Sequence, residues 1–247
     1  MKDNFSKQAD GYATFRPSYP REAFDFILSF VPNKNTAWDC GTGNGQLAVQ
    51  LAEHFDKVYA TDISEKQISK AAKKDNIVYE VSSAEENAFT VSQFDLITVA
   101  QAIHWFDFDR FYAKVNVTLK NGGIIAAIGY NLPESDEAIN LVIRHLYADI
   151  LDDYWDPERK YIDNEYKNIP FPFKEIPVSE KFAQRAMWTI EDLKGYLNTW
   201  SAVQHYLKTN TENPVDAVLD DFKKAWGDGE KKEFRFPTLL RIGRVIK

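Results

Sequence analysis

The sequence predicts an α/β fold built on a doubly wound parallel sheet. Short apolar runs alternate with amphipathic, helix-like segments from residue 20 to residue 130. A glycine-rich stretch at 41–45 (GTGNG) separates the first apolar run from a helical pattern, and Asp62 ends the second run. Because strands that alternate with helices form parallel sheets, we expect one sheet with its ligand site at the carboxyl ends of the strands.

Five strands and four helices are predicted in this first part of the chain. The strands are short apolar runs at 36–40, 57–62, 77–81, 94–100 and 124–128. Apolar residues at spacings of three and four predict helices after Pro20, from Gln46, over Ser64–Lys74 and over Phe108–Leu119. Each helix is long enough to return the chain to the start of the next parallel strand.

The alternation ends after Tyr130, and the following residues are predicted to be mainly helical. One helix is predicted at 134–152. A second begins near Thr189, which resembles a capping box together with Asp192. A third starts at 213–214, where proline follows asparagine, and ends at glycine 227.

Two short apolar runs close the chain and divide it into two parts. Residues 232–236 and 239–246 are predicted to be strands. We therefore interpret 131–230 as a helical cap inserted before the last two strands. Residues 1–130 and 231–247 then form the ligand-binding core, with an N-terminal arm that is rich in proline and aromatic residues.

The glycine-rich loop indicates a ligand with an amino-acid end. Glycines at 41, 43 and 45 let a ligand approach the backbone N–H groups and the start of the next helix. The dinucleotide pattern G-x-G-x-x-G would need glycine at position 46, which is Gln46. Asp39 stands two residues before the first glycine and can face an ammonium group, directly or through water. S-adenosylmethionine (SAM) has such a group, so the loop favours SAM over NAD.

Asp62 is predicted to bind the ribose of this ligand. It lies 17 residues after Gly45, at the end of the second strand, where a carboxylate in a βαβ unit accepts both ribose hydroxyls. Each such charge-assisted hydrogen bond contributes about 1.5–3 kcal/mol. The alternative is a purely structural role beside the helix that Ser64 and Gln67 start as a capping box.

Composition excludes several classes of partner. The formal net charge is −7, and no long run of basic residues is present, which argues against nucleic acid. The single cysteine, Cys40, allows no intramolecular disulfide. The N-terminus is polar and no apolar run approaches the ~20 residues that span a bilayer. We expect a cytoplasmic protein with a small-molecule partner, as a monomer or a homodimer, and no membrane contact.

Several motifs resemble those of the class I SAM-dependent methyltransferases. Besides the loop and the acid, Ser83-Ala84-Glu85 stands where such proteins often carry Asp-Ala-Glu. The stretches 12–20 (YATFRPSYP), 104–106 (HWF) and 196–201 (YLNTWS) are similar to the subgroup that includes trans-aconitate and cantharidin methyltransferases. The resemblance covers nearly the whole chain. It implies a Rossmann-like sheet of seven strands, the last two forming an antiparallel pair.

The resemblance also implies which residues bind SAM. The N-terminal arm would close over the cofactor, and Arg16 could pair with its carboxylate or form a surface ion pair. Ser83 replaces the acid that meets adenine in the family, so adenine binding would rely on backbone groups and a hydroxyl. The cofactor-binding residues that we predict are Tyr12, Arg16, Tyr19, Asp39, Gly41, Thr42, Gly43, Asp62, Ile63, Ser83, Ala84 and Gln101.

The acceptor is predicted to meet His104, which follows the fourth strand at the carboxyl edge of the sheet. A carboxylate acceptor is already ionised and needs no general base, whereas a hydroxyl or thiol would use His104 as one. The histidine could equally be structural. Further candidates for acceptor contact are Trp105, Trp200, His205, Arg144 and Arg185.

Two alternatives to methylation of a carboxylate stay open. A carboxylate acceptor of the aconitate type is the sharper hypothesis, and a natural-product hydroxyl or thiol is the alternative. A SAM-binding regulatory protein without turnover is a second alternative. No metal site is predicted, because the acid pairs at 85–86 and 152–153 lack histidine or cysteine partners.

Overall fold

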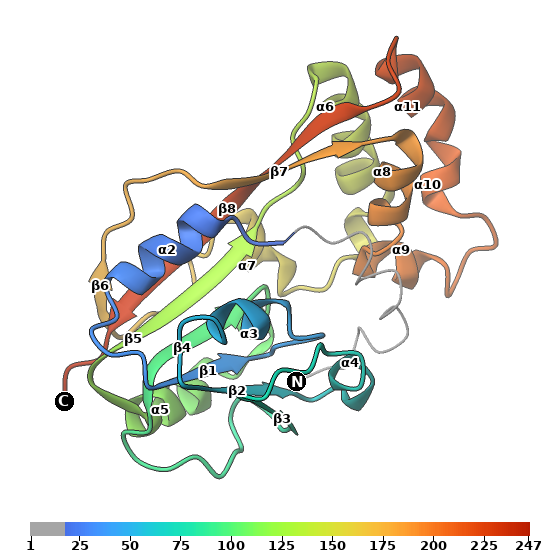
Figure 1. The fold of residues 1–247 in the computed structure, drawn as a ribbon. Coiled ribbons are helices and arrows are strands. Elements are labelled where there is room, and N and C mark those ends of the chain that lie inside the picture. Colours follow the sequence, from blue (N-terminus) through green and yellow to red (C-terminus); the bar gives the residue numbers. More distant parts are fainter. Residues whose placement is uncertain (1–17) are drawn as a thin grey trace.

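The computed structural model describes residues 18–247, and it confirms the doubly wound α/β fold (Figure 1). One sheet runs in the order β3-β2-β1-β4-β5-β8-β6. Its five parallel strands are β1 (Thr36–Cys40), β2 (Lys57–Asp62), β3 (Ile77–Val81), β4 (Phe94–Ala100) and β5 (Leu119–Tyr130). Strands β2 and β3 are added on one side of β1, and β4 and β5 on the other. The carboxyl ends of β1 and β4 therefore form the crevice in which such sheets bind ligands.

The last part of the sheet differs from the prediction of two closing strands. Residues 232–244 form one continuous strand, β8 (Lys232–Arg244), which runs antiparallel to β5. Pro237 marks the place where β8 changes partners, because residues up to Pro237 pair with β7 (Ala183–Trp188) and residues from Thr238 onward pair with β5. The proline thus ends one pairing without ending the strand, and the missing N–H is tolerated there.

The range 131–230, predicted as a helical cap, also supplies strands to the sheet. β6 (Lys174–Ile176) pairs antiparallel with the end of β8, and β7 pairs with its beginning. The helices of this range gather mostly at one end of the molecule, around the first half of β8 (Figure 1). They are α6 (Glu137–Arg144), α7 (Arg159–Asp163), α8 (Ile190–Leu197), α9 (Ser201–Tyr206), α10 (Pro214–Ala217) and α11 (Leu219–Trp226).

Two of the helices predicted in the cap are divided in the structure. The helix predicted from 213–214 to 227 is α10 and α11, which meet at Val218. Thr189 caps α8 in a capping box with Asp192, and Gly227 ends α11. The helix predicted at 134–152 is α6 followed by a π-helical turn, η3 (His145–Ile150), and a 3-10 turn, η4 (Asp152–Tyr154). Ile139, Ile143 and Leu146 are nevertheless buried on one side, as their spacing indicates.

The helices of the core flank the parallel strands. They are α2 (Arg21–Ser29), α3 (Gln46–Leu51), α4 (Glu65–Ile68), α5 (Phe108–Thr118) and the 3-10 turn η2 (Ile103–Trp105). α4 is much shorter than the helix predicted over 64–74, although Ser64 caps it through the Gln67 N–H. Few apolar side chains follow Ile68, so a longer helix would bury little surface, and tertiary packing supplies most helical stability.

Three apolar clusters hold the two parts together. One lies against one face of the sheet around Trp38 and Phe94, and a second includes Phe24 and Ile128. The third belongs to the cap and includes Phe236 of β8. Because β8 pairs with β5 and also enters the cap cluster, it fixes the cap against the carboxyl edge of the sheet. Within residues 18–247, no helix is both long and apolar enough to cross a bilayer.

Candidate active site

The glycine-rich loop after β1 is folded tightly against β2. The backbone N–H groups of Gly41 and Thr42 both donate to the carbonyl oxygen of Thr61, at 2.9 Å each. Gly41, Gly43 and Gly45 have positive φ angles of 70°, 56° and 80°. Side chains other than glycine are strained in that conformation, which accounts for glycine at every second position of the loop.

Gly43 is the glycine of this loop that leaves room for a ligand. A Cβ atom added at Gly43 would meet no atom of the described chain within 4 Å. At Gly41 it would lie 2.7 Å from the Ala102 Cβ atom, and at Gly45 2.4 Å from the Tyr79 hydroxyl. The outer glycines therefore allow close packing of the protein, whereas the middle one exposes the backbone to open space.

Asp39 holds the glycine-rich loop in place through buried hydrogen bonds. Its side chain is fully buried, and its carboxylate accepts hydrogen bonds from the hydroxyls of Thr42 (2.5 Å) and Thr98 (2.9 Å). Burial raises the pKa of Asp39 from 3.8 to about 6, with a smaller contribution from the charge of Asp62. The ammonium contact stays a prediction. Because a nearby cation favours the ionised carboxylate, such a contact would make ligand affinity depend on pH near the pKa of Asp39.

Asp62 joins the loop to the end of β2. Its carboxylate accepts one hydrogen bond from the Gly43 N–H (2.8 Å) and one from the Ser64 N–H (2.9 Å). Asp62 therefore has the structural role that was the alternative to ribose binding. It does not replace the ribose prediction, because the same bonds hold the carboxylate beside the open space at Gly43.

The other predicted cofactor residues beside this loop have smaller structural roles. Ser83 accepts a hydrogen bond from the Glu86 N–H at 2.9 Å, and Ala84 is buried in the core. Ile63 is half-buried. Tyr19 packs against Tyr130, with ring centroids 6.2 Å apart. The predicted residues Tyr12 and Arg16 lie outside the described residues.

These residues fit SAM. The loop leaves open space at Gly43, and Asp62 lies beside it at the end of the adjacent strand. A glycine without a side chain lets the amino-acid end of SAM approach the backbone closely, and Asp62 suits ribose hydroxyls.

Gln101 joins the ends of β4 and β5. Its side-chain oxygen accepts from the Tyr130 N–H (2.9 Å), and its amide nitrogen donates to the Tyr130 carbonyl (3.3 Å). Its φ angle is 51°, an unusual value for a residue other than glycine. Gly129 makes the approach possible, because a Cβ atom there would lie 2.6 Å from the Gln101 oxygen. The side chain therefore shapes the sheet edge at the predicted site.

His104 is buried beside that edge and is neutral at physiological pH. Only 4% of its surface is exposed, and its Nδ1 atom has no hydrogen-bond partner among the described residues. Its ring lies 4.9 Å from that of Trp105 and stacks with Tyr166 at 6.3 Å. Burial, and secondarily the charge of Arg159, lower the pKa of His104 to about 3.

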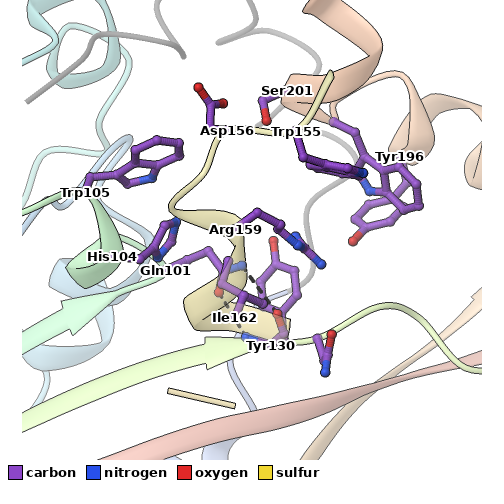
Figure 2. Close-up of a pocket in the computed structure, with 12 residues that line it drawn as sticks. Gln101, His104, Trp105, Tyr130, Trp155, Asp156, Arg159, Ile162, Tyr196 and Ser201 are labelled. Atoms are coloured by element: carbon purple, nitrogen blue, oxygen red, sulfur yellow. Dashed lines mark hydrogen bonds between the residues drawn. The ribbon is translucent and has the colours of Figure 1, made fainter. Parts of the chain in front are cut away.

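A cavity opens beside His104, between the sheet edge and residues of the cap (Figure 2). The space in it that the centre of a water-sized molecule can occupy is ≈ 50 Å³. Figure 2 shows His104 and Trp105 on one side, Trp155 and Tyr196 on the other, and Arg159 between them. The lining residues are Gln101, His104, Trp105, Tyr130, Asn131, Trp155, Asp156, Arg159, Ile162, Tyr196, Trp200 and Ser201.

The cavity includes four of the predicted residues and leaves out three. Gln101, His104, Trp105 and Trp200 line it. The other three are occupied in contacts of their own. His205 interacts with the Tyr154 carbonyl oxygen (2.9 Å), while Arg144 and Arg185 form exposed ion pairs with Glu137 and Glu233. The two arginines therefore lie outside this cavity.

Within residues 18–247, no group of three or more histidine, cysteine or acidic side chains is arranged to hold a metal ion. Cys40, the single cysteine of the chain, is fully buried, and burial raises the pKa of its thiol well above the ordinary value. A buried, protonated thiol is a poor nucleophile.

Known proteins with the same sequence features are methyltransferases. A family profile described as a methyltransferase domain matches residues 38–127. A Dictyostelium discoideum protein named as a methyltransferase is 33% identical over 98% of this chain and 95% of its own length. The chain belongs to the class I SAM-dependent methyltransferases. It therefore uses SAM as its methyl donor.

Two further comparisons agree with this assignment of the methyltransferase. Yeast CRG1, named as a SAM-dependent methyltransferase, is 22% identical over 86% of both chains. The solved structure of a protein from Anaeromyxobacter dehalogenans, described as a type II methyltransferase, superposes with a TM-score of 0.86. It is 35% identical and covers 94% of this chain and 99% of its own. These names specify the reaction class and leave the acceptor open.

Sequence reasoning missed the cationic residue of the methyltransferase cavity. Arg159 opens α7, which lies between the helices predicted at 134–152 and near Thr189, where we predicted none. Trp155 precedes it by four residues, but no motif distinguishes this pair from other aromatic and charged residues of the cap. The excess of aromatic residues after position 150 was the available signal, and it does not indicate which of them meet.

Proposed function

We propose that this methyltransferase transfers the methyl group of SAM to a carboxylate oxygen of a small-molecule acid, with acids of the aconitate type as the sharper form of the hypothesis. The supporting observation is the cavity beside His104. It combines a neutral, buried histidine with the cationic side chain of Arg159. A cavity of this kind suits an anion that reacts without losing a proton.

A carboxylate acceptor needs no general base. Its pKa lies near 4, so it is ionised at neutral pH and already nucleophilic. His104, with a pKa of about 3, is too weak a base to take a proton from a hydroxyl or amine efficiently. Its unpartnered Nδ1 atom can instead take part in one hydrogen bond that orients the acceptor. In this role His104 is the catalytic residue, because it touches the acceptor.

The cofactor supplies an electrophilic methyl group on its sulfonium sulfur, and the protein supplies position and exclusion of water. We assign the amino-acid end of SAM to the loop 41–45 and Asp39, and the ribose to Asp62. Ile63, Ser83 and Ala84 would flank the adenine, and Gln101 would meet the methionine part. Tyr12, Arg16 and Tyr19 would cover the cofactor from the N-terminal arm.

A product screen tests this proposal. The purified protein is incubated with SAM and a panel of acids, alcohols and thiols that includes trans-aconitate, and the products are identified by mass spectrometry. A methyl ester that base hydrolyses back to the acid supports the proposal. Methyl ethers or thioethers, with no ester from any acid, would contradict it and favour the hydroxyl or thiol alternative.

The role of His104 is tested on the same reaction. His104→Ala should lower turnover of the acid while the affinity for SAM, measured by calorimetry, stays within about twofold of wild type. His104→Asn, which keeps a polar side chain, should lose less turnover than alanine. Unchanged turnover in both variants would leave His104 with a structural role alone.

A further inference from the structure

Arg159 is the cationic side chain that lines the cavity (Figure 2). It starts α7, and only 16% of its side chain is exposed. In Figure 2 its guanidinium group points between Tyr130 and Trp155, into the space that the aromatic residues surround. Placing a charge in such surroundings costs free energy unless its N–H groups find partners.

The Nε side of Arg159 is bound, and the other side is left open. Its Nε atom donates to the Tyr147 hydroxyl (3.0 Å) and to an Asp163 carboxylate oxygen (3.2 Å). The guanidinium also lies over the rings of Tyr147 and Trp155, 5.2 and 4.9 Å from their centroids. Its two terminal nitrogens make no hydrogen bond within residues 18–247.

Arg241 provides a comparison within the same molecule. Its side chain is also 16% exposed, but all three of its nitrogens are bound. They donate to both carboxylate oxygens of Glu175 and to the backbone carbonyls of Tyr166 and Ile169. The protein thus satisfies one half-buried arginine completely. In Arg159 it satisfies the same chemical group on one side only.

The other charged residues that the structure describes around the cavity do not bind the terminal nitrogens of Arg159. Asp163 is engaged by the Nε atom and by the Tyr147 hydroxyl, which donates to it at 2.7 Å. Asp156 lies 3.9 Å from His205, and Figure 2 shows its carboxylate turned away from the guanidinium. His104 is neutral. The remaining partner for two parallel N–H donors is an anion from solution, and a carboxylate matches their geometry.

We propose that Arg159 is the anion anchor of the acceptor: its two terminal nitrogens bind a carboxylate of the substrate, and Tyr147 with Asp163 holds the guanidinium in place. This inference rests on the proposed acceptor class and names the residue that selects it. The aromatic walls, chiefly Trp155, Tyr196 and Trp200, contact the carbon skeleton of the acid. Arg159 is therefore a specificity-determining residue, and Tyr147 is a positioning residue.

Binding is measured without turnover, so that failure of the anchor is distinct from failure of the methyl transfer. Calorimetry in the presence of S-adenosylhomocysteine uses three acid and amide pairs as probes: benzoate and benzamide, trans-cinnamate and cinnamamide, hexanoate and hexanamide. Each amide has the shape of its acid without the charge. The wild-type protein should bind at least one acid more tightly than its amide.

Arg159→Ala should weaken binding of that acid about tenfold or more, since it removes charge-assisted hydrogen bonds. Binding of the paired amide should stay within about twofold, which shows that the cavity is intact. Arg159→Lys should retain part of the acid affinity, because it keeps the charge and loses the planar fork. Arg144→Ala removes an arginine from an exposed ion pair outside the cavity and should leave both affinities unchanged.

Three results would overturn the proposal. One is a wild-type protein that binds none of the acids better than its amide. Another is an Arg159→Ala variant that binds the acid as tightly as wild type. The last is an equal loss of acid and amide affinity in Arg159→Ala and Arg159→Lys, which indicates that the arginine only supports the cavity wall.

Tyr147 tests the bracing part of the proposal. Tyr147→Phe keeps the ring under the guanidinium and removes the hydroxyl that bonds the Nε atom and Asp163. Acid affinity should fall about threefold, less than in Arg159→Ala, with the amide unaffected. An unchanged acid affinity would remove Tyr147 from the proposal, and an equal loss for the amide would assign it to packing.

Discussion

The proposed cofactor site and the proposed acceptor site of this methyltransferase are built in different ways. The proposed cofactor site is centred on residues 39–62, where two adjacent strands are held together by backbone hydrogen bonds and by the bond from the Gly43 N–H to the Asp62 carboxylate. The acceptor cavity draws on four segments between residues 101 and 201, and mostly on side chains. A common cofactor can therefore be bound by a local motif, whereas acceptor choice depends on how the cap packs on the sheet.

The largest effect that we predict is a loss of SAM affinity on substitution of Gly43. Gly43 and Gly122 have positive φ angles (56° and 78°), and a Cβ atom at either would meet no atom of the described chain within 4 Å. Gly43→Ala and Gly122→Ala should therefore lose similar stability, about 1 kcal/mol. Only Gly43→Ala should lose SAM affinity, by about tenfold or more, in a calorimetric titration. Equal SAM affinity in the two variants would contradict the open space as the cofactor site.

The second prediction concerns Asp39 and pH. Its pKa is about 6 in the folded protein and 3.8 ordinarily, so the folded state holds the proton between these values and stability falls as pH rises through that window. A cationic ligand favours the ionised form, so affinity for S-adenosylhomocysteine should rise with pH and level off above about 6. At pH 5 it should be about tenfold weaker than at pH 8. Asp39→Asn should flatten this profile, and a flat wild-type profile would exclude the ammonium linkage.

The third prediction uses His104 to probe the proposed acceptor site. The pKa of His104 is about 3 in the folded protein and 6.5 ordinarily. Between pH 3 and pH 6.5 His104 is therefore protonated in the unfolded chain and neutral in the folded protein. The free energy of unfolding is therefore unaffected by this protonation above pH 6.5, and it decreases as the pH falls below 6.5. Between pH 7 and pH 5 the wild type should lose about 2 kcal/mol more unfolding free energy than His104→Gln. Urea unfolding at the two pH values measures this difference.

His104 should also leave the reaction rate insensitive to pH. With saturating SAM and acid, kcat should show no inflection near pH 6.5, because a histidine with a pKa of about 3 stays neutral throughout the range. A rate that rises through pH 6.5 and loses this rise in His104→Gln would instead identify a general base, and with it a hydroxyl or thiol acceptor.

The smallest effect on acceptor binding is expected for substitution of His205. This substitution tests where the cavity ends. Its Nδ1 atom is occupied by the Tyr154 carbonyl, and the residue is absent from the described cavity lining. His205→Ala should leave the KM for the acid within about twofold. A rise in KM of tenfold or more would extend the acceptor site beyond the cavity in Figure 2.

Local patterns were sufficient to predict most of the core. The five parallel strands lie where apolar runs place them, and the glycine loop precedes α3 as its spacing indicates. These features depend on neighbours in the chain: side-chain periodicity, turn conformation and helix capping. The position of Asp62 beside Gly43 follows from two adjacent parallel strands, β1 and β2, so it was also predictable.

Only the tertiary structure decided the packing of the cap and the cavity that we propose as the acceptor site. The strand β8 continues through Pro237 because β7 and β5 pair with it in turn, and no local signal shows such a change of partner. Arg159 faces the cavity because Tyr147 and Asp163, 12 residues before it and four after it, hold its Nε atom. By itself the sequence determined the fold class and the cofactor, since both depend on short-range patterns. The acceptor cavity depends on contacts between distant segments, and those exist only after the chain has packed.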